Sequence, residues 1–86
     1  MKGIVVTLEQ LEKVPSWIKD RLMVNFSGKD KFHLISSNDD ETMIGEAVCA
    51  ITGEEKIPVY TDTDSIMWKY PKWKGETIGD YGVVIE

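Results

Sequence analysis

Thiols and imidazoles are almost absent from this chain: Cys49 is the only cysteine and His33 the only histidine among 86 residues. One cysteine excludes an internal disulfide and any zinc site built from several thiolates. Cys49 lies in the apolar run 47–51, where a thiol is typically an inert packing group. His33 has no companion histidine with which to bind a metal. We therefore expect no catalytic site, no metal site and no cofactor, and we interpret the protein as non-enzymatic.

Glycine-rich phosphate loops and long apolar runs are missing as well. The seven glycines fit neither the spacing G-x-x-x-x-G-K-[ST] nor G-x-G-x-x-G, which disfavours ATP- and dinucleotide-dependent chemistry. No apolar stretch approaches the roughly 20 residues that a membrane span needs. Residues 1–7 lack the apolar core of a secretory signal. From these features we expect a cytoplasmic protein without a membrane partner.

The charge is acidic and unevenly spread. The net charge is −5, but residues 68–74 contain three lysines and no acid, so the remainder carries 7 basic and 15 acidic residues. An acidic body repels nucleic acids and anionic membranes, and it attracts basic proteins. We therefore expect no direct binding of nucleic acid.

The apolar patterns predict a single α+β domain over residues 1–86. Strands are expected at 2–7, 22–26, 31–35, 42–51, 56–61 and 79–85, and helices at 8–13 and 15–22. Thr7 and Gln10 form a capping box at the start of the first helix, and Pro15 interrupts the helical pattern. The predicted architecture is a mainly antiparallel sheet of five to six strands. One kinked helix, or two short helices, near the N-terminus packs on one face of it.

Two of the expected strands have positions that the sequence specifies. Strand 42–51 is apolar on both faces in its second half, which favours a central place under the helix. Strand 56–61 contains Pro58, which lacks an amide donor and therefore favours a sheet edge. Between it and the last strand lies the loop 62–75.

The loop 62–75 has the most distinctive chemistry of the chain, because it holds two of the three tryptophans together with three lysines. Rings interleaved with ammonium groups can stack on a ligand, bind an anion or anchor a protein partner. The predicted binding residues are Trp68, Lys69, Tyr70, Lys72, Trp73 and Lys74. In the alternative interpretation the rings fold back as a lid on the core and the lysines stay in water. Different residues of the loop can follow different interpretations.

Acidic side chains supply a second set of predicted contact residues, namely Asp39, Asp40, Glu41, Asp62 and Asp64. Those at 39–41 would steer a basic partner. Asp62 and Asp64 are two residues apart and would project to the same side of an extended chain. Such a pair can bind Mg²⁺ or Ca²⁺, but the ligand spacing of a calcium loop is missing, which favours solvated carboxylates.

These features lead to one main functional hypothesis: a small acidic, non-catalytic binding protein that occupies a surface of a larger macromolecule as an inhibitor or adaptor. Phage-encoded inhibitors of host enzymes or defence systems share this general profile. The expected partner is a protein, and a homodimer is left open. Two alternatives remain. One is an oligomeric protein that sequesters a small anionic ligand such as a nucleotide, and the other is an acidic mimic of nucleic acid.

Overall fold

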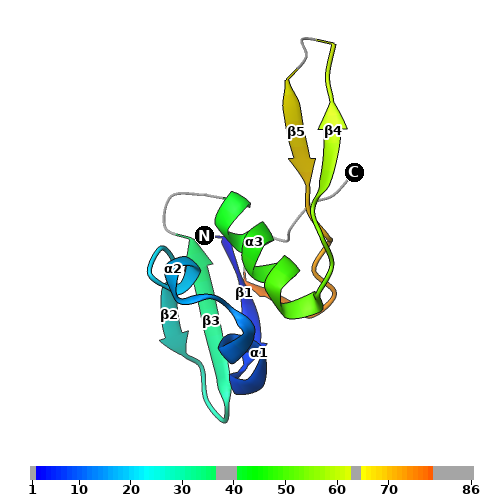
Figure 1. The fold of residues 1–86 in the computed structure, drawn as a ribbon. Helices are drawn as coiled ribbons and strands as arrows, with labels where there is room; N and C mark the ends of the chain where they lie inside the picture. Colours follow the sequence, from blue (N-terminus) through cyan, green and yellow to red (C-terminus); the bar gives the residue numbers. More distant parts are fainter. Residues whose placement is uncertain (1, 37–40, 63–64, 79–86) are drawn as a thin grey trace.

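The computed structural model describes residues 2–36, 41–62 and 65–78 (Figure 1). Its elements are β1 (Lys2–Thr7), α1 (Leu8–Lys13), α2 (Ser16–Lys19), β2 (Met23–Phe26), β3 (Lys31–Ser36), α3 (Glu41–Thr52), β4 (Ile57–Tyr60), β5 (Ile66–Lys69) and β6 (Glu76–Ile78). Four strands form an antiparallel sheet in the order β2-β3-β1-β6, and β4 and β5 form a separate two-stranded sheet. The α+β class and the antiparallel pairing are as predicted.

Strand β1 lies inside the sheet, as its β-branched sequence predicts. It pairs with β3 over its whole length, with Ile4 opposite Leu34, and with β6 on its other side. Ile4, Val6 and Leu34 are buried. This strand therefore provides the floor of the core.

The N-terminal helices also follow the local signals. The Thr7 hydroxyl accepts from the Gln10 amide (3.2 Å), and the Gln10 side chain accepts from the Thr7 amide (3.0 Å), which completes the capping box. Helix α1 has the predicted bounds. Pro15 separates it from α2, which is shorter than the predicted 15–22 because residues 20–22 turn toward β2.

The strand predicted at 42–51 is wrong, because this segment forms α3. Its buried residues Ile44, Ala47, Val48 and Ile51 recur at intervals of three and four, which is the spacing of one helical face. Gly53 ends the helix with a φ of 76°, and its amide donates to the Cys49 carbonyl (2.9 Å). The continuous apolar run 47–51 favours a strand, but a helix places Ile44, Ala47, Val48 and Ile51 on one face and buries all four side chains.

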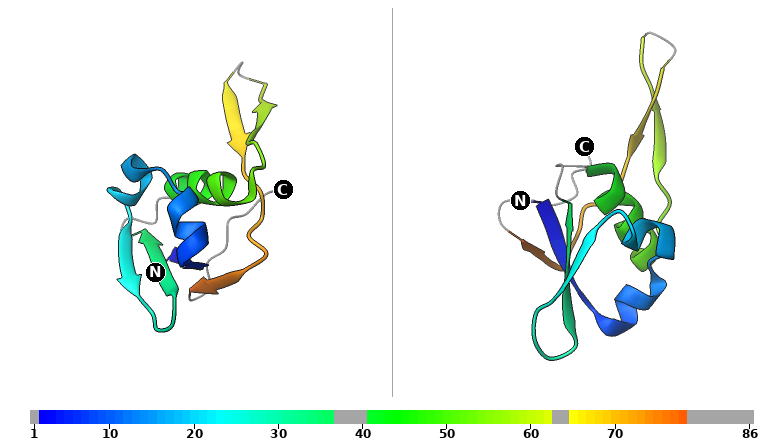
Figure 2. Two further views of the ribbon diagram at one scale, coloured as in Figure 1. Left: turned by 60° about the horizontal axis from the view of Figure 1, so that its bottom comes forward. Right: turned by 90° about the vertical axis from the view of Figure 1, so that its left-hand side faces the viewer.

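Helix α3 is the main cover of the sheet, and all three helices lie on the same side of it (Figure 2). The prediction that the covering helix lies near the N-terminus is therefore wrong, although the two short helices do occur there. The core between helices and sheet is formed by Ile4, Val6, Val14, Ile18, Leu22, Leu34, Ile44, Ala47, Val48, Ile51 and Trp73.

The prediction of a five- to six-stranded sheet is also wrong, for two physical reasons. Residues 42–51 are helical, and the strands β4 and β5 leave the body as a hairpin of their own. The edge position of Pro58 is confirmed, since β4 pairs with β5 alone among the described strands. The expected strand 79–85 lies outside the described residues; the fourth strand of the sheet is β6 at 76–78. Within the described part of the chain, no helix has the length and apolar character to cross a membrane.

Candidate functional site

The hairpin β4–β5 projects from the body as an arm (Figures 1 and 2). The molecule measures 47 Å along its long axis and only 24 and 23 Å across. Four residue pairs form the ladder, from Ile57 opposite Lys69 to Tyr60 opposite Ile66. Beyond it, the Thr61 amide donates to the Ser65 carbonyl (3.1 Å). Most of the arm thus stands clear of the four-stranded sheet.

The register of the arm assigns its side chains to two faces, because residues directly opposite each other share a face. One face carries Ile57, Val59, Met67 and Lys69. The other carries Pro58, Tyr60, Ile66 and Trp68, and the alternation continues to Lys56 and Tyr70. Trp68 and Lys69 therefore point in opposite directions.

Both faces of the arm expose large apolar side chains. Five of them are 46–74% exposed: Ile57, Tyr60, Ile66, Met67 and Trp68. With roughly 200 Å² for a large side chain, these five present on the order of 600 Å² to solvent. Tyr60, Ile66 and Trp68 share one face and present about 340 Å², and Ile57 and Met67 present about 240 Å² on the opposite face. The Trp68 face alone therefore reaches the size of the largest apolar patch of a typical monomeric protein, about 300–600 Å², and such patches commonly mark interaction sites.

The base of the arm is fixed by Tyr70, whose ring packs on α3 at Gly45. A Cβ atom at Gly45 would lie 2.5 Å from Cγ of Tyr70, so the ring fills the space that a side chain would occupy. Pro71, the next residue, is buried. The ring–glycine contact therefore sets where the arm leaves the body.

The two interpretations of the segment 62–75 apply to different residues of it. Trp73 is 9% exposed, belongs to the core, and donates its indole N–H to the Glu76 carbonyl. Tyr70 is half-buried against the same core. These two rings are the predicted lid, whereas Trp68 is 46% exposed on the arm. Of the predicted aromatic anchors, only Trp68 is available to a partner in this structure.

The three lysines of the loop do not form one surface with the exposed ring. Lys69 lies on the arm face opposite Trp68. Lys72 and Lys74 are exposed and line a cleft of about 410 Å³ with the buried Trp73, at the C-terminal end of α3. The rings and ammonium groups that are adjacent in sequence are therefore separated in space.

The acidic contact residues were predicted in two groups. Asp39, Asp40 and Asp64 lie outside the described residues. Glu41 is the first residue of α3. Asp62 is exposed at the outer end of the arm, beyond β4.

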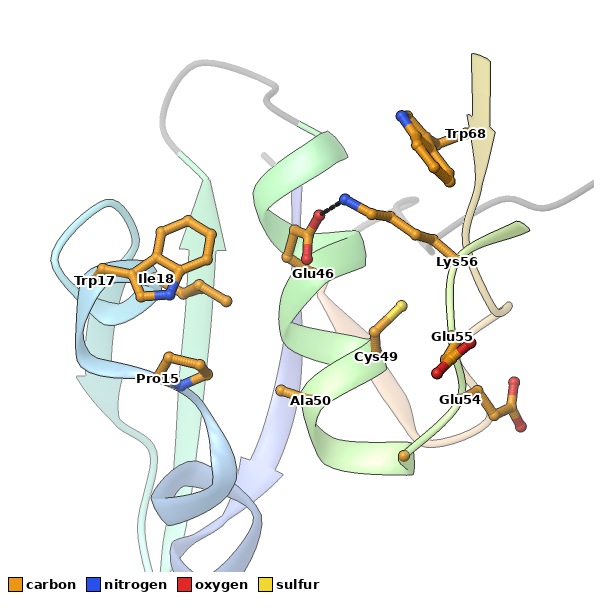
Figure 3. Close-up of a pocket in the computed structure, with 11 residues that line it drawn as sticks. Pro15, Trp17, Ile18, Glu46, Cys49, Ala50, Glu54, Glu55, Lys56 and Trp68 are labelled. Carbon is orange, nitrogen blue, oxygen red and sulfur yellow. Dashed lines mark hydrogen bonds and ion pairs between the residues drawn. The ribbon is translucent and has the colours of Figure 1, made fainter. Parts of the chain in front are cut away.

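A groove of about 520 Å³ adjoins the arm and was not predicted. Its lining comes from four segments: Pro15, Trp17, Ile18, Glu46, Cys49, Ala50, Gly53, Glu54, Glu55, Lys56 and Trp68. Trp17 on α2 and Trp68 on β5 stand on opposite sides of α3 (Figure 3). Trp17 is 51% exposed, because it lies off the apolar face that Val14 and Ile18 bury. The position of Trp17 outside this apolar face is the one sequence signal that indicates an exposed ring on the α2 side of the groove.

The electrostatics of the groove centre on Glu46 and Lys56. The Lys56 ammonium lies 2.8 Å from Oε1 of Glu46 and 4.9 Å from the ring centroid of Trp68 (Figure 3). The hydrogen bond that the Lys56 ammonium donates to the Glu46 carboxylate raises the pKa of Lys56. Burial, with the Glu46 charge next in importance, raises the pKa of the Cys49 thiol and of the Tyr70 hydroxyl. At neutral pH the thiol is therefore protonated and a poor nucleophile.

Arm and groove together offer apolar area, two exposed indole rings and carboxylates, which are binding groups. Among the described residues, no cluster of three or more His, Cys, Asp or Glu side chains is placed to hold a metal ion. His33 is half-buried in the sheet opposite Val5, away from the groove. Comparisons of the chain with protein-family models, with curated proteins and with solved structures found no match.

Proposed function

We propose that this protein is a non-catalytic binding protein that occupies a surface of a larger protein, with the β4–β5 arm as its anchor. The observation that carries the proposal is the arm itself. It exposes five large apolar side chains at 46–74% on a projecting two-stranded ribbon. A small domain has little stability to spare, and exposed apolar area of this kind contributes nothing to its own core.

The size of the exposed surface is consistent with this role. Covering the Trp68 face, about 340 Å² at roughly 25 cal/mol per Å², yields a gross gain on the order of 9 kcal/mol, and enclosing both faces, about 600 Å² in total, yields on the order of 15 kcal/mol. Association costs an estimated 4–15 kcal/mol before any net affinity remains. The arm is thus sufficient to begin an interface, and further contacts beside it are needed for tight binding. Trp68 and Tyr60 are of the residue types that dominate interface energetics.

The acidic character of the chain favours a basic partner. The net charge is −5, and a complementary field accelerates association and suppresses wrong partners more than it raises affinity. The sequestration of a nucleotide receives less support, because that hypothesis needs an exposed ring beside lysines. Trp73 is buried, and Lys69 points away from Trp68. Lys56 does lie against the exposed Trp68, but Glu46 already compensates its charge. No observation on the described residues favours nucleic-acid mimicry over binding of a basic protein.

The test is affinity purification from the source organism with wild-type and variant baits, followed by the intact mass of the complex. Trp68→Ala and Met67→Ser each remove apolar area from one face of the arm. Phe26→Ala is the matched control, because Phe26 is 70% exposed on β2, in the separate four-stranded sheet. Circular dichroism verifies that each bait is folded.

We expect the partner recovered by the wild type and by Phe26→Ala to be lost or strongly depleted with both arm variants. Loss with Phe26→Ala but not with the arm variants would place the interface on the sheet edge. Equal recovery with all baits would overturn the role of the arm.

A further inference from the structure

We propose that the groove beside the arm binds an arginine side chain on an extended basic segment of the partner. This inference deepens the proposed function and rests on it, because it assigns a chemistry to the protein that the arm would hold. The walls of the groove, its uncompensated charge and the cation that it already contains support an arginine at this place.

The walls suit a flat, partly apolar group. Trp17 and Trp68 stand on either side of α3 with half of their surface exposed, and Cys49 and Ala50 of that helix lie between them (Figure 3). The groove has a volume of about 520 Å³ and is open to solvent, so it can take a side chain from an adjoining protein surface. The methylene groups of an arginine pack on such walls, and its guanidinium plane stacks on an indole face.

The charge of the groove is unbalanced. Its ionisable side chains are Glu46, Glu54, Glu55 and Lys56, besides the protonated Cys49. Glu46 is compensated by Lys56 at 2.8 Å. Glu54 and Glu55 are exposed and form no ion pair with any residue that the structure describes. Two carboxylates therefore remain to bind a cation, and a guanidinium pairs with carboxylates through two parallel hydrogen bonds.

The Lys56 ammonium shows how this groove holds a positive group. It lies between the Glu46 carboxylate and the face of Trp68, so a carboxylate and a ring act on it together. Glu54 and Glu55 lie on the same side of α3 as Lys56 and Trp68, and Trp17 lies across the helix (Figure 3). The basic segment would cross the groove from Trp17 over Cys49 and Ala50. Its arginine would pair with Glu54 and Glu55 and leave the Lys56 pair intact.

The test is a titration of the ¹⁵N-labelled full chain, observed through the three indole N–H signals in NMR. The ligand is the peptide acetyl-Gly-Arg-Gly-Arg-Gly-amide, and its control is the same peptide with neutral citrulline in place of arginine. Trp73 is an internal reference, because it is buried outside the groove. We expect saturable shifts of both the Trp17 and the Trp68 signals at millimolar arginine peptide. The Trp73 signal should stay fixed, and the citrulline peptide should cause no shift.

A matched pair of double variants distinguishes binding of the peptide in the groove from general electrostatic attraction to an acidic protein. Glu54→Gln with Glu55→Gln should weaken the arginine peptide about five-fold, since each exposed charge pair contributes a modest amount. Glu9→Gln with Glu12→Gln makes the same change in net charge on α1, outside the groove, and should leave the affinity within about two-fold.

The inference is overturned if the indole signals do not move at 10 mM peptide, if citrulline is equivalent to arginine, or if the two double variants weaken binding equally. The titration uses no native partner, so it is independent of the purification that tests the arm. Loss of the partner with arm variants but no peptide binding would refute the arginine site alone. Peptide binding with arm variants that still recover the partner would refute the anchor role alone.

Discussion

Replacing Gly45 by alanine would place a methyl group against the ring of Tyr70. The added Cβ would lie 2.5 Å from Cγ, 2.7 Å from Cδ1 and 2.9 Å from Cδ2 of that ring. All three distances are shorter than carbon atoms tolerate, so the ring must shift. Because Tyr70 connects β5 to the core, this shift disturbs the base of the arm.

Two effects of opposite sign determine the change in the free energy of unfolding. Alanine at an interior helix position stabilises a helix by about 1 kcal/mol relative to glycine. Forcing an additional group into a filled space costs about 1–3 kcal/mol. Gly45→Ala should therefore destabilise the protein by about 1 kcal/mol. In a Tyr70→Ala background the space is open, and the same substitution should stabilise it by about 1 kcal/mol.

The assay is urea unfolding of four proteins, namely the wild type, the two single variants and the double variant, followed by circular dichroism. The cycle should give a coupling free energy of about 2 kcal/mol between the two positions. A Gly45→Ala effect of the same sign and size in both backgrounds would refute the contact between Tyr70 and α3. It would also remove our account of how the arm is positioned.

Three further predictions concern the loop tryptophan and the groove. Trp73→Phe should lower the free energy of unfolding by about 2 kcal/mol, because the protein loses buried volume and a hydrogen bond. The control Trp17→Phe should change the free energy of unfolding by less than about 0.5 kcal/mol, because Trp17 is exposed. Equal effects of the two substitutions in urea unfolding would contradict the core role of Trp73. The pKa of Lys56 is raised in the folded state, so its ion pair stabilises the fold at pH values below the ordinary lysine pKa of 10.5 and stops doing so as the pH rises through the folded-state pKa. The difference in free energy of unfolding between wild type and Lys56→Met should therefore shrink in alkali. A difference that grows in alkali would contradict this account. The Cys49 thiol should react with iodoacetamide with a pH midpoint above that of a blocked cysteine without a free carboxylate, N-acetylcysteine amide, and Glu46→Gln should lower that midpoint. A midpoint below the reference compound would indicate an activated thiol.

The features that the sequence predicts well are those encoded over a few residues. The Thr7–Gln10 capping box and the break at Pro15 each depend on neighbouring side chains. Such signals do not require knowledge of the rest of the fold.

Helix α3 was missed because two periodicities coexist in residues 42–51. The apolar run 47–51 fits a strand that is buried on both faces, while the spacing of Ile44, Ala47, Val48 and Ile51 fits a helix. Burial decides between them, and burial depends on the sheet that this segment covers. The sequence pattern alone therefore did not separate the two structures.

The exposure of Trp68 agrees with the interpretation of the segment 62–75 as a binding surface, but Trp68 lies on strand β5 of the arm and not in the expected loop. Which rings of this segment are buried depends on two glycines: Gly45 on α3 accommodates Tyr70, and a side chain at Gly75 would collide with Trp73. The groove was missed because α2, α3, the segment that follows it and β5 meet there only in the folded chain.

Hydroxyl-radical footprinting of the complex with the purified partner tests the central claim most directly, because it reads the solvent access of individual side chains. Met67 and Trp68 are exposed in the free protein, as is Phe26 on the separate sheet. The account predicts that oxidation of Met67 and Trp68 falls several-fold in the complex while that of Phe26 does not change. Protection of Phe26 with undiminished oxidation of the two arm residues would contradict it.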